Sequence, residues 1–334
     1  MTARPTSRPT DQDPTAGTTT SAPAPFAAEV RDVVVRYPRS DGVPALDRAT
    51  LTVRPGVITG LLGRNGAGKT TLAALLAAFR RPTAGTVRVG PAGDLEDPFE
   101  NVWATVHTQL VRESGDVWET DKARDTLEYY ADLRPHWDAD LAARLLDELE
   151  VDVRKKPSEM SRGKRSALGA VIGLAARAPL TIFDEVYLGM DAPSRYAFYD
   201  ALVADYAEHP RTILLSSHLI SEVERLFEDV VIIDRGRVLL AENADDVRAR
   251  GVSLTGPAEV VERHAAGREV LARQRLGGTA QVTLFGTFAD DERAAAAEAG
   301  LEVGAVPVQD LFVHLTRAGR DEVGARPDTT EEAR

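Results

Sequence analysis

The chain has 334 residues, of which 43% are hydrophobic and 28% are charged, enough for one large or two modest domains with apolar cores. Its 52 acidic residues outnumber its 40 Lys and Arg residues. The formal net charge of −12 argues against a sequence-independent grip on nucleic acid, which needs a clustered basic face. The absence of cysteine excludes disulfides, thiol catalysis and Cys-ligated zinc.

Residues 1–27 are rich in Thr, Pro, Ser and Ala and carry few large apolar side chains. Burial in such a segment cannot offset the entropy lost on ordering it, so we predict a disordered tail, and its polar start predicts no signal peptide. The longest apolar stretch of the chain, 167–176, is too short to cross a bilayer. We therefore expect a cytoplasmic protein that reaches a membrane only through a separate partner.

Short apolar segments at 33–35, 51–53, 86–89 and 102–107 predict strands of an α/β nucleotide-binding core. Among them, the apolar segment 57–62 also has the pattern of a buried strand, and a glycine-rich loop and a helical pattern follow it. The order strand, loop, helix is the context in which a phosphate-binding loop functions.

The glycine-rich loop at 63–70 has the sequence GRNGAGKT and matches the P-loop pattern G-x-x-x-x-G-K-[ST]. Its glycines permit positive φ and bring backbone N–H groups close to phosphate oxygens at the start of the next helix. Lys69 adds a positive charge for the β- and γ-phosphates, Thr70 offers a hydroxyl to Mg²⁺, and Thr71 can bind the α-phosphate. The residues predicted to bind the nucleotide here are Gly63, Asn65, Gly66, Ala67, Gly68, Lys69, Thr70 and Thr71.

From about 121 to 162 the pattern is mainly helical, and strands alternate with helices again over 180–234. We predict a core domain over 28–250 with a helical subdomain inserted at about 112–165. Beyond the core, we predict a small α+β accessory domain over 251–319 and a loose tail over 320–334. The elements expected in the accessory domain are strands at 269–276, 281–285 and 312–316 and helices near 257–265 and 289–299.

Two acids follow the apolar run that begins at Leu180. Asp184 ends this strand beside the P-loop, where it can hold the Mg²⁺ shell, and Glu185 is placed one residue further on to orient an attacking water. The apolar strand 212–216 leads to His218, which we expect to hydrogen-bond the γ-phosphate. A P-loop alone leaves kinases, G-proteins, helicases and transport ATPases open, and the paired acids favour an ATPase.

Over roughly 29–250 these motifs resemble the nucleotide-binding subunit of an ATP-binding cassette (ABC) transporter. In that family a short signature, typically L-S-G-G-Q, opens a helix that completes the ATP site of the opposite subunit. Residues 160–164, MSRGK, take this place, so the resemblance assigns Ser161 and Gly163 to a γ-phosphate across a dimer. Arg162 stands where a glycine is common and Lys164 where a glutamine is common.

The resemblance implies three further site residues. Asp191 follows Gly189 and Met190 as in the family's D-loop, which would place it at the dimer seam. Gln109 suits the family's Q-loop, whose glutamine touches Mg²⁺ and water, with a surface glutamine as the alternative. Tyr37 is a candidate for stacking on adenine, with packing in an edge strand as the alternative.

The resemblance implies an ATPase that dimerises, as a homodimer or a heterodimer, around two ATP molecules with Mg²⁺. It would drive a separate transmembrane permease from the inner face of the cell membrane. Residues 134–138, around Trp137, resemble a pattern of drug-export and antibiotic-resistance ABC ATPases and so suggest efflux of a small molecule, although Trp137 can equally serve packing.

Two other classes of protein share the P-loop. One is a soluble ABC ATPase that acts on nucleic acid or ribosomes without a permease. Its members carry very long coiled coils or tandem cassettes, neither of which this chain shows, and the acidic balance predicts no nucleic-acid partner. The other is a small-molecule kinase, which would need neither Ser161 nor His218.

Overall fold

The computed structural model describes residues 24–38, 42–113, 117–286 and 288–324. Most of the tail predicted over 1–27 lies outside the described residues, and its last residues already belong to a strand, β1 (Phe26–Val35). Among the described residues, none of the helices combines the length and the apolar character that crossing a bilayer requires.

A six-stranded sheet forms the centre of the core, in the order β5-β6-β7-β3-β8-β9. All neighbouring strands are parallel except β8 and β9, which pair antiparallel. β3 is buried along its whole length, as the continuous apolar run of its sequence predicts for a strand covered on both faces. The strands are β3 (Ile58–Gly63), β5 (Thr108–Arg112), β6 (Leu180–Asp184), β7 (Thr212–Ser217), β8 (Asp229–Asp234) and β9 (Arg237–Asn243).

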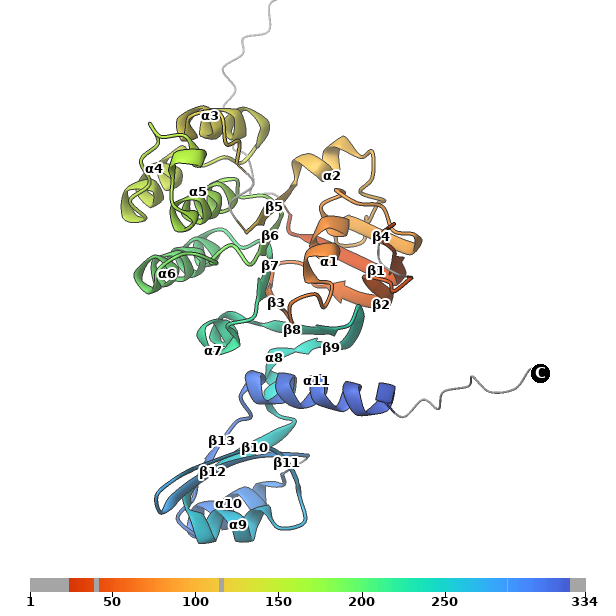
Figure 1. Ribbon diagram of the computed structural model, residues 1–334, viewed down its shortest axis with the longest axis vertical. Coiled ribbons are helices and arrows are strands. Elements are labelled where there is room, and N and C mark those ends of the chain that lie inside the picture. Colours follow the sequence, from red (N-terminus) through yellow and green to blue (C-terminus); the bar gives the residue numbers. More distant parts are fainter. Residues whose placement is uncertain (1–23, 39–41, 114–116, 287, 325–334) are drawn as a thin grey trace, which may run out of the picture.

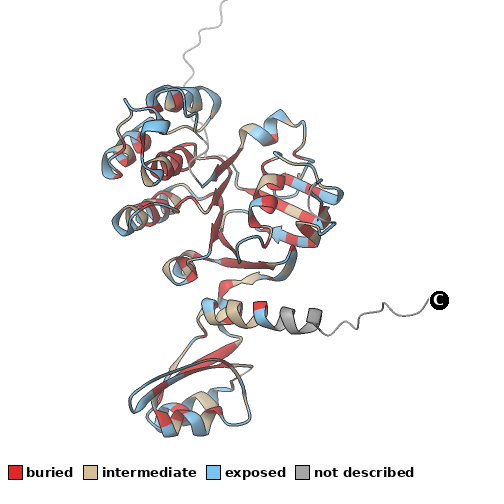
Figure 2. Ribbon diagram, viewed as in Figure 1, coloured by how far each residue is buried: buried red, intermediate tan, exposed pale blue. Residues whose placement is uncertain are grey.

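Two apolar clusters cover the two faces of this sheet, because successive residues of a strand point to opposite sides. On one face, Leu61 packs with helix α1 (Lys69–Leu76) and a small antiparallel sheet. On the other face, Leu62 packs with helices of the helical subdomain and with α6 (Ala192–Glu208). The central sheet is therefore the buried layer to which the site loops are attached (Figure 2).

The small sheet has the order β2-β1-β4, with β2 (Leu46–Val53) and β4 (Ala84–Pro91) on either side of β1. The strands predicted at 33–35, 51–53 and 86–89 lie within these three strands. The strand predicted at 102–107 is wrong, because that segment forms helix α2 (Val102–Val106).

The side chain of Asn101 explains this difference. It accepts a hydrogen bond from the Ala104 N–H at 3.0 Å and so caps the helix, while Trp103 stacks on Phe26 with ring centroids 4.8 Å apart. These two interactions outweigh the strand preference of the Val, Trp and Thr side chains in the segment. The strand of this region comes later, as β5.

The helical subdomain lies beside the β5 edge of the central sheet (Figure 1). Arg177 and Asp138 join it to the core through an ion pair of 2.7 Å, and Asp205 of α6 receives both Arg177 at 2.8 Å and Arg211 at 2.7 Å. Burial lowers the pKa of the Arg211 guanidinium and the charge of Asp205 opposes this effect. The helices of the subdomain are α3 (Ala123–Leu133), α4 (Ala139–Glu148), the 3-10 turn η1 (Pro157–Glu159) and α5 (Arg162–Ala175).

Short elements after β7 connect the core to the C-terminal part of the chain. They are α7 (Ile220–Val223), η2 (Glu224–Leu226) and α8 (Ala244–Arg248). The helices α6 and α7 belong to the alternation of strands and helices predicted over 180–234.

The C-terminal part has the element order βαββαβ and forms a four-stranded antiparallel sheet, β11-β12-β10-β13. Because β12 pairs antiparallel with both β10 and β11, these two strands run parallel with β12 between them, which is a split βαβ arrangement. Val252, Leu254 and Val282 pack with the two helices on one face of this sheet. The elements are β10 (Gly251–Pro257), α9 (Ala258–Ala265), β11 (Glu269–Leu276), β12 (Thr279–Phe285), α10 (Asp290–Glu298) and β13 (Glu302–Gly304).

A long helix, α11 (Val308–Gly324), lies between this sheet and the core in Figure 1. The strand predicted at 312–316 and the tail predicted from 320 are therefore wrong up to Gly324. Val308, Leu311, Phe312 and Leu315 pack into the cluster that contains α5 and α6. Their spacing is that of a helix face, and it outweighs the strand preference of the Phe and Val side chains.

Replacing Asp205 with Ala tests the buried ion network. The substitution leaves the buried guanidinium of Arg211 without its carboxylate and Arg177 with Asp138 alone, so we expect the free energy of unfolding to fall by about 3–5 kcal/mol in urea titrations. Glu208, an exposed acid near the end of the same helix, is the matched control, and Glu208→Ala should change stability by less than about 0.5 kcal/mol. Equal stability of the two variants would contradict the role given to the network.

Candidate functional site

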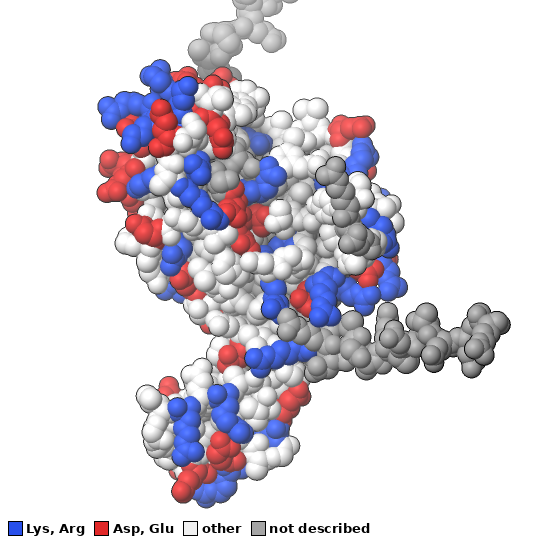
Figure 3. All heavy atoms as spheres, in the orientation of Figure 1, with Lys and Arg blue, Asp and Glu red and all other residues white. Residues whose placement is uncertain are grey.

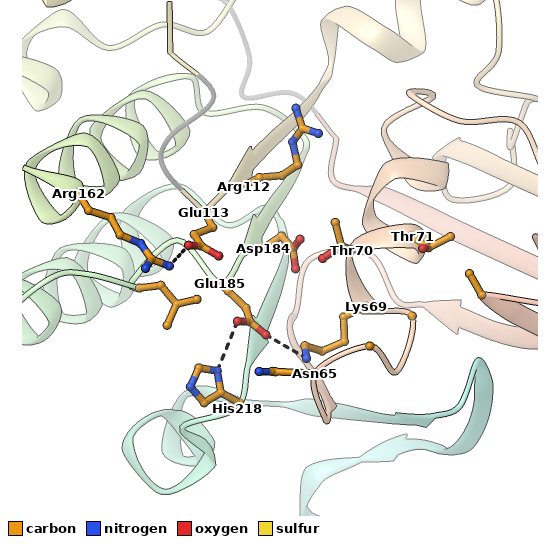
Figure 4. A pocket seen from close by; sticks show the side chains of 14 residues that line it. Asn65, Lys69, Thr70, Thr71, Arg112, Glu113, Arg162, Asp184, Glu185 and His218 are labelled. Atoms are coloured by element: carbon orange, nitrogen blue, oxygen red, sulfur yellow. Dashed lines mark ion pairs between the residues drawn. The ribbon is translucent and has the colours of Figure 1, made fainter. Parts of the chain in front are cut away.

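A cleft of about 710 Å³ opens where β3, β6 and β7 end (Figure 4). Neighbouring parallel strands place their carboxyl ends on one edge of a sheet, so the residues after them are brought together. The predicted site residues that line the cleft are Asn65, Gly66, Gly68, Lys69, Thr70, Thr71, Asp184, Glu185 and His218.

The turn from β3 into α1 requires glycine at three points. Gly66 has φ +78° and Gly68 has φ +111°, a region that side chains rarely adopt. A Cβ on Gly68 would lie 2.7 Å from the Ala45 carbonyl oxygen, and one on Gly63 would lie 2.6 Å from the Ile233 oxygen. Ala67 is buried and its N–H donates to the Arg64 oxygen, so it contributes packing to the turn.

Lys69 is the first residue of α1, and its ammonium group is enclosed by acceptors. It donates to the Gly63 oxygen at 2.7 Å and to the Arg64 oxygen at 3.2 Å, and it forms an ion pair with Glu185 Oε1 at 2.9 Å. Lys69 is 5% exposed and Glu185 is 16% exposed. Each of the three N–H donors therefore has a protein acceptor, and phosphate oxygens must replace at least one of them on binding.

The two acids after β6 are oriented by a residue of β7 that the sequence analysis did not single out. Ser216 donates from Oγ to Asp184 Oδ1 at 2.6 Å and accepts the N–H of Glu185 at 3.1 Å. Glu185 has φ +51°, an unusual value for a residue with a long side chain, and this conformation aims its carboxylate between Lys69 and His218. Asp184 is nearly buried and stays beside Thr70 in the lining of the cleft.

His218 follows β7 and lies on the other side of Glu185. Its Nδ1 is 3.4 Å from Glu185 Oε2 and 2.9 Å from the hydroxyl oxygen of Tyr187. Tyr187 lies two residues after Glu185, and the sequence pattern did not predict its contact with this histidine.

Ser161 is the N-cap of α5 and accepts the Lys164 N–H at 3.3 Å. Gly163 packs against the backbone that follows the acids, since a Cβ there would lie 2.4 Å from the Gly189 oxygen. The ammonium group of Lys164 donates to the Leu149 oxygen at 2.7 Å and joins α5 to α4. Its charge is thus used within the helical subdomain.

Arg162 points from the start of α5 into the cleft and forms an ion pair with Glu113 (Figure 4). Glu113 comes directly after β5, next to Arg112, and both residues line the cleft. The pairing of β5 with β6 places them beside Asp184, and the sequence analysis missed them because it predicted the strand at 102–107. The glycine-to-arginine departure at 162 therefore adds a cation to this side of the cleft.

The structure does not bring Gln109 into the cleft. Gln109 lies within β5, opposite Thr181, and its side chain is buried and donates to the Leu110 oxygen at 3.0 Å. β5 continues for three residues beyond it, to Arg112. The end of the strand presents Arg112 and Glu113 in its place.

Tyr37 and Asp191 lie outside the lining of the cleft. The hydroxyl of Tyr37 is 3.2 Å from Thr71 Oγ1, and the guanidinium of Arg80 stacks 3.7 Å from the centre of its ring. Asp191 is the N-cap of α6, where its hydrogen bond with Ser194 lowers its pKa. It is exposed, as a residue at a subunit contact would be in an isolated chain.

Comparisons with known proteins agree with this geometry. Residues 46–187 match the family model described as ABC transporter. The chain is 34% identical over 239 residues to a protein of Streptomyces coelicolor named as an ABC transporter ATP-binding protein, covering 68% of this chain and 40% of that one. The chain thus spans less than half the length of this relative.

Two further relatives match over a similar region. A methionine import ATP-binding protein of Burkholderia lata is 29% identical over 229 residues, 66% of each chain. The daunorubicin resistance ATP-binding protein DrrA3 of Streptomyces coeruleorubidus is 29% identical over 211 residues, 61% of this chain and 65% of that one.

The fold has counterparts among solved structures. One described as the ATP binding subunit of an ABC transporter superposes with a TM-score of 0.57 at 24% identity, covering 66% of this chain and 91% of that one. The core therefore has the α/β fold of an ABC-type P-loop NTPase, and residues 46–187 within it match the ABC transporter family model.

Replacing Gly163 with Ala tests the contact between α5 and the segment after the acids. The added Cβ would clash with the Gly189 oxygen, so we expect the free energy of unfolding to fall by about 1–3 kcal/mol. Gly278 has no atom within 4 Å of such a Cβ, and Gly278→Ala should stay within about 0.5 kcal/mol of the parent protein in the same urea titration. A Gly163 variant as stable as the Gly278 control would show that this contact is not close.

Proposed function

We propose that this chain binds and hydrolyses ATP as the nucleotide-binding subunit of an ABC transporter. The observation that carries the proposal is the contact of Lys69, Glu185 and His218 at one edge of the sheet, within a cleft that begins at a P-loop. These are the three groups that a γ-phosphate and an attacking water require.

Phosphate binding uses the turn between β3 and α1. Amides of the turn and the start of α1 offer hydrogen bonds and a positive dipole end, and Lys69 exchanges its protein acceptors for β- and γ-phosphate oxygens. Asn65 and Thr71 border the same cleft.

The Thr70 hydroxyl and the Asp184 carboxylate suit Mg²⁺, which binds proteins through one or two hard oxygen ligands together with substrate phosphates. Ser216 fixes the orientation of Asp184 for this task. When bound, the ion supplies neutralisation of the phosphate charge.

Hydrolysis follows from the position of Glu185. Once a phosphate draws Lys69 away, the Glu185 carboxylate is released from its ion pair and accepts a hydrogen bond from the attacking water. The water oxygen bonds to the γ-phosphorus while the bond from that phosphorus to the β–γ bridging oxygen breaks. Lys69 and His218 stabilise the charge that develops on the phosphate oxygens.

The exposed start of α5 supports a dimer, either of two identical chains or with a related subunit. Ser161 and Gly163 are the residues we assign to the γ-phosphate bound by the partner, and Asp191 lies at the seam. We propose that adenine stacks on Tyr37. The adenine would then either share the tyrosine ring with the Arg80 guanidinium or displace that guanidinium from it.

A second groove of about 330 Å³ lies between the core and the helical subdomain. Phe79 is 62% exposed and Trp118 is 46% exposed, and both line this groove together with Tyr130. We propose that it receives the permease, which holds the chain at the inner face of the membrane. Arg112 lines both this groove and the nucleotide cleft, so it can connect permease contact with the site.

Efflux of a small molecule remains part of the proposal and rests on the resemblance of residues 134–138. In the structure Arg134 donates to the Thr105 and Val106 oxygens, and Trp137 packs against the main apolar cluster.

On the face shown in Figure 3 basic and acidic side chains are interspersed, which suits the proposal that no nucleic acid is bound.

Glu185→Gln tests the hydrolytic step. The amide cannot take a proton from water, so we expect ATP turnover to fall by about 10²–10⁴-fold while equilibrium ATP binding is retained. Lys69→Ala should lose the binding itself, and Glu148→Gln, an exposed acid on α4, should change neither quantity. Phosphate release and nucleotide binding are measured on each variant, and unchanged turnover in Glu185→Gln would overturn the mechanism.

The lack of cysteine allows a direct test of the groove. Phe79→Cys carrying a thiol-directed photocrosslinker should capture, in membranes of the source cells, a protein that mass spectrometry identifies as having several membrane-spanning helices. Leu276→Cys is the control, because Leu276 is 87% exposed on the C-terminal sheet, away from the groove. Equal capture by both variants, or capture of soluble proteins alone, would contradict permease docking at the groove.

A further inference from the structure

The hydroxyl of Tyr187 is the centre of a set of hydrogen bonds beneath His218. It accepts the backbone N–H of His218 at 3.0 Å and the Ser217 hydroxyl at 3.2 Å, and it lies 2.9 Å from His218 Nδ1. Tyr187 is 1% exposed and Ser217 is fully buried. The hydroxyl is therefore fixed on three sides by the protein.

The capacity of a tyrosine hydroxyl decides the direction of the third hydrogen bond. The oxygen has two lone pairs and one proton, and His218 N–H and the Ser217 hydroxyl use the lone pairs. Ser217 donates its one hydroxyl proton to Tyr187, and its oxygen accepts the Leu219 N–H at 2.9 Å. The Tyr187 proton is thus left for His218 Nδ1, which must accept it.

Burial favours this arrangement. It raises the pKa of the Tyr187 hydroxyl, so the group keeps its proton at neutral pH and remains a donor. If His218 Nδ1 carried a proton, that proton would be directed at Glu185 Oε2, 3.4 Å away, and the Tyr187 proton would lose its acceptor. A neutral imidazole that accepts at Nδ1 carries its proton at Nε2.

We propose that Tyr187 is a positioning residue that fixes His218 in the Nε2–H tautomer and in the orientation needed to donate to the γ-phosphate. The inference rests on the proposed ATPase function and adds to it a residue that fixes the ring. The Nε2–H tautomer also gives His218 and Glu185 separate tasks. His218 then donates its proton to the phosphate, and the Glu185 carboxylate is available to the attacking water.

Tyr187→Phe tests the proposal, because it removes the hydroxyl and keeps the buried ring. We expect kcat for ATP to fall by about 10- to 100-fold with KM changed less than about twofold, as for other partners that orient a reacting group. Tyr199→Phe is the matched control. Tyr199 is also 1% exposed, and its hydroxyl has no hydrogen-bond partner among the described residues, so its removal should leave kcat unchanged.

The tautomer is measured directly by ¹⁵N NMR of histidine-labelled protein, with His218 assigned from the signal lost in His218→Gln. The parent protein should show the Nε2–H tautomer at His218, and Tyr187→Phe should show a mixture with Nδ1–H. This NMR measurement needs no ATP hydrolysis, so it still decides the role of Tyr187 if the proposed ATPase function is wrong.

A double-mutant cycle separates positioning from a general loss of stability. If Tyr187 acts through His218, Tyr187→Phe should cause no further loss of turnover in a His218→Gln protein. Additive losses, or an unchanged His218 tautomer in Tyr187→Phe, would overturn the proposal.

Discussion

The site depends on the parallel pairing of β3, β6 and β7. In this register Asp184 lies opposite Ser216, and Leu62 lies opposite Ser217, so the three strands end together. Lys69, Glu185 and His218 are far apart in sequence and meet only because of this common edge. A slip of one residue in any of the strands would turn the alternating side chains over and separate the acids from the P-loop.

The charges at this edge compensate each other within the protein. Lys69 is paired with Glu185, and Arg162 with Glu113 on the far side of the same cleft. A bound triphosphate competes with both carboxylates for these cations. In the proposed function, binding therefore releases the Glu185 carboxylate and loosens the start of α5, which would couple occupation of the cleft to the surface proposed for the partner subunit.

The sequence was most informative where function lies in short local patterns. The P-loop and the acids after β6 need only neighbouring residues, and β6 has the predicted bounds. Gln109 shows the limit, because the apolar segment 102–107 predicts a strand that ends just before the glutamine. The cap at Asn101 turns that segment into a helix and moves the strand to Thr108–Arg112, so Glu113 takes the place at the strand end. The role proposed for Tyr187 was not predictable, since it arises only through contact with the end of β7 and with His218.

The ion pair of Lys69 with Glu185 should give way to phosphate when a nucleotide binds. A structure of the protein with Mg²⁺ and a non-hydrolysable ATP analogue would show the exchange. We expect the Lys69 ammonium on β- and γ-phosphate oxygens, Glu185 turned to a water near the γ-phosphorus, and Ser161 of a second chain at the γ-phosphate. A nucleotide bound in the cleft with the Lys69–Glu185 ion pair still intact would contradict this exchange.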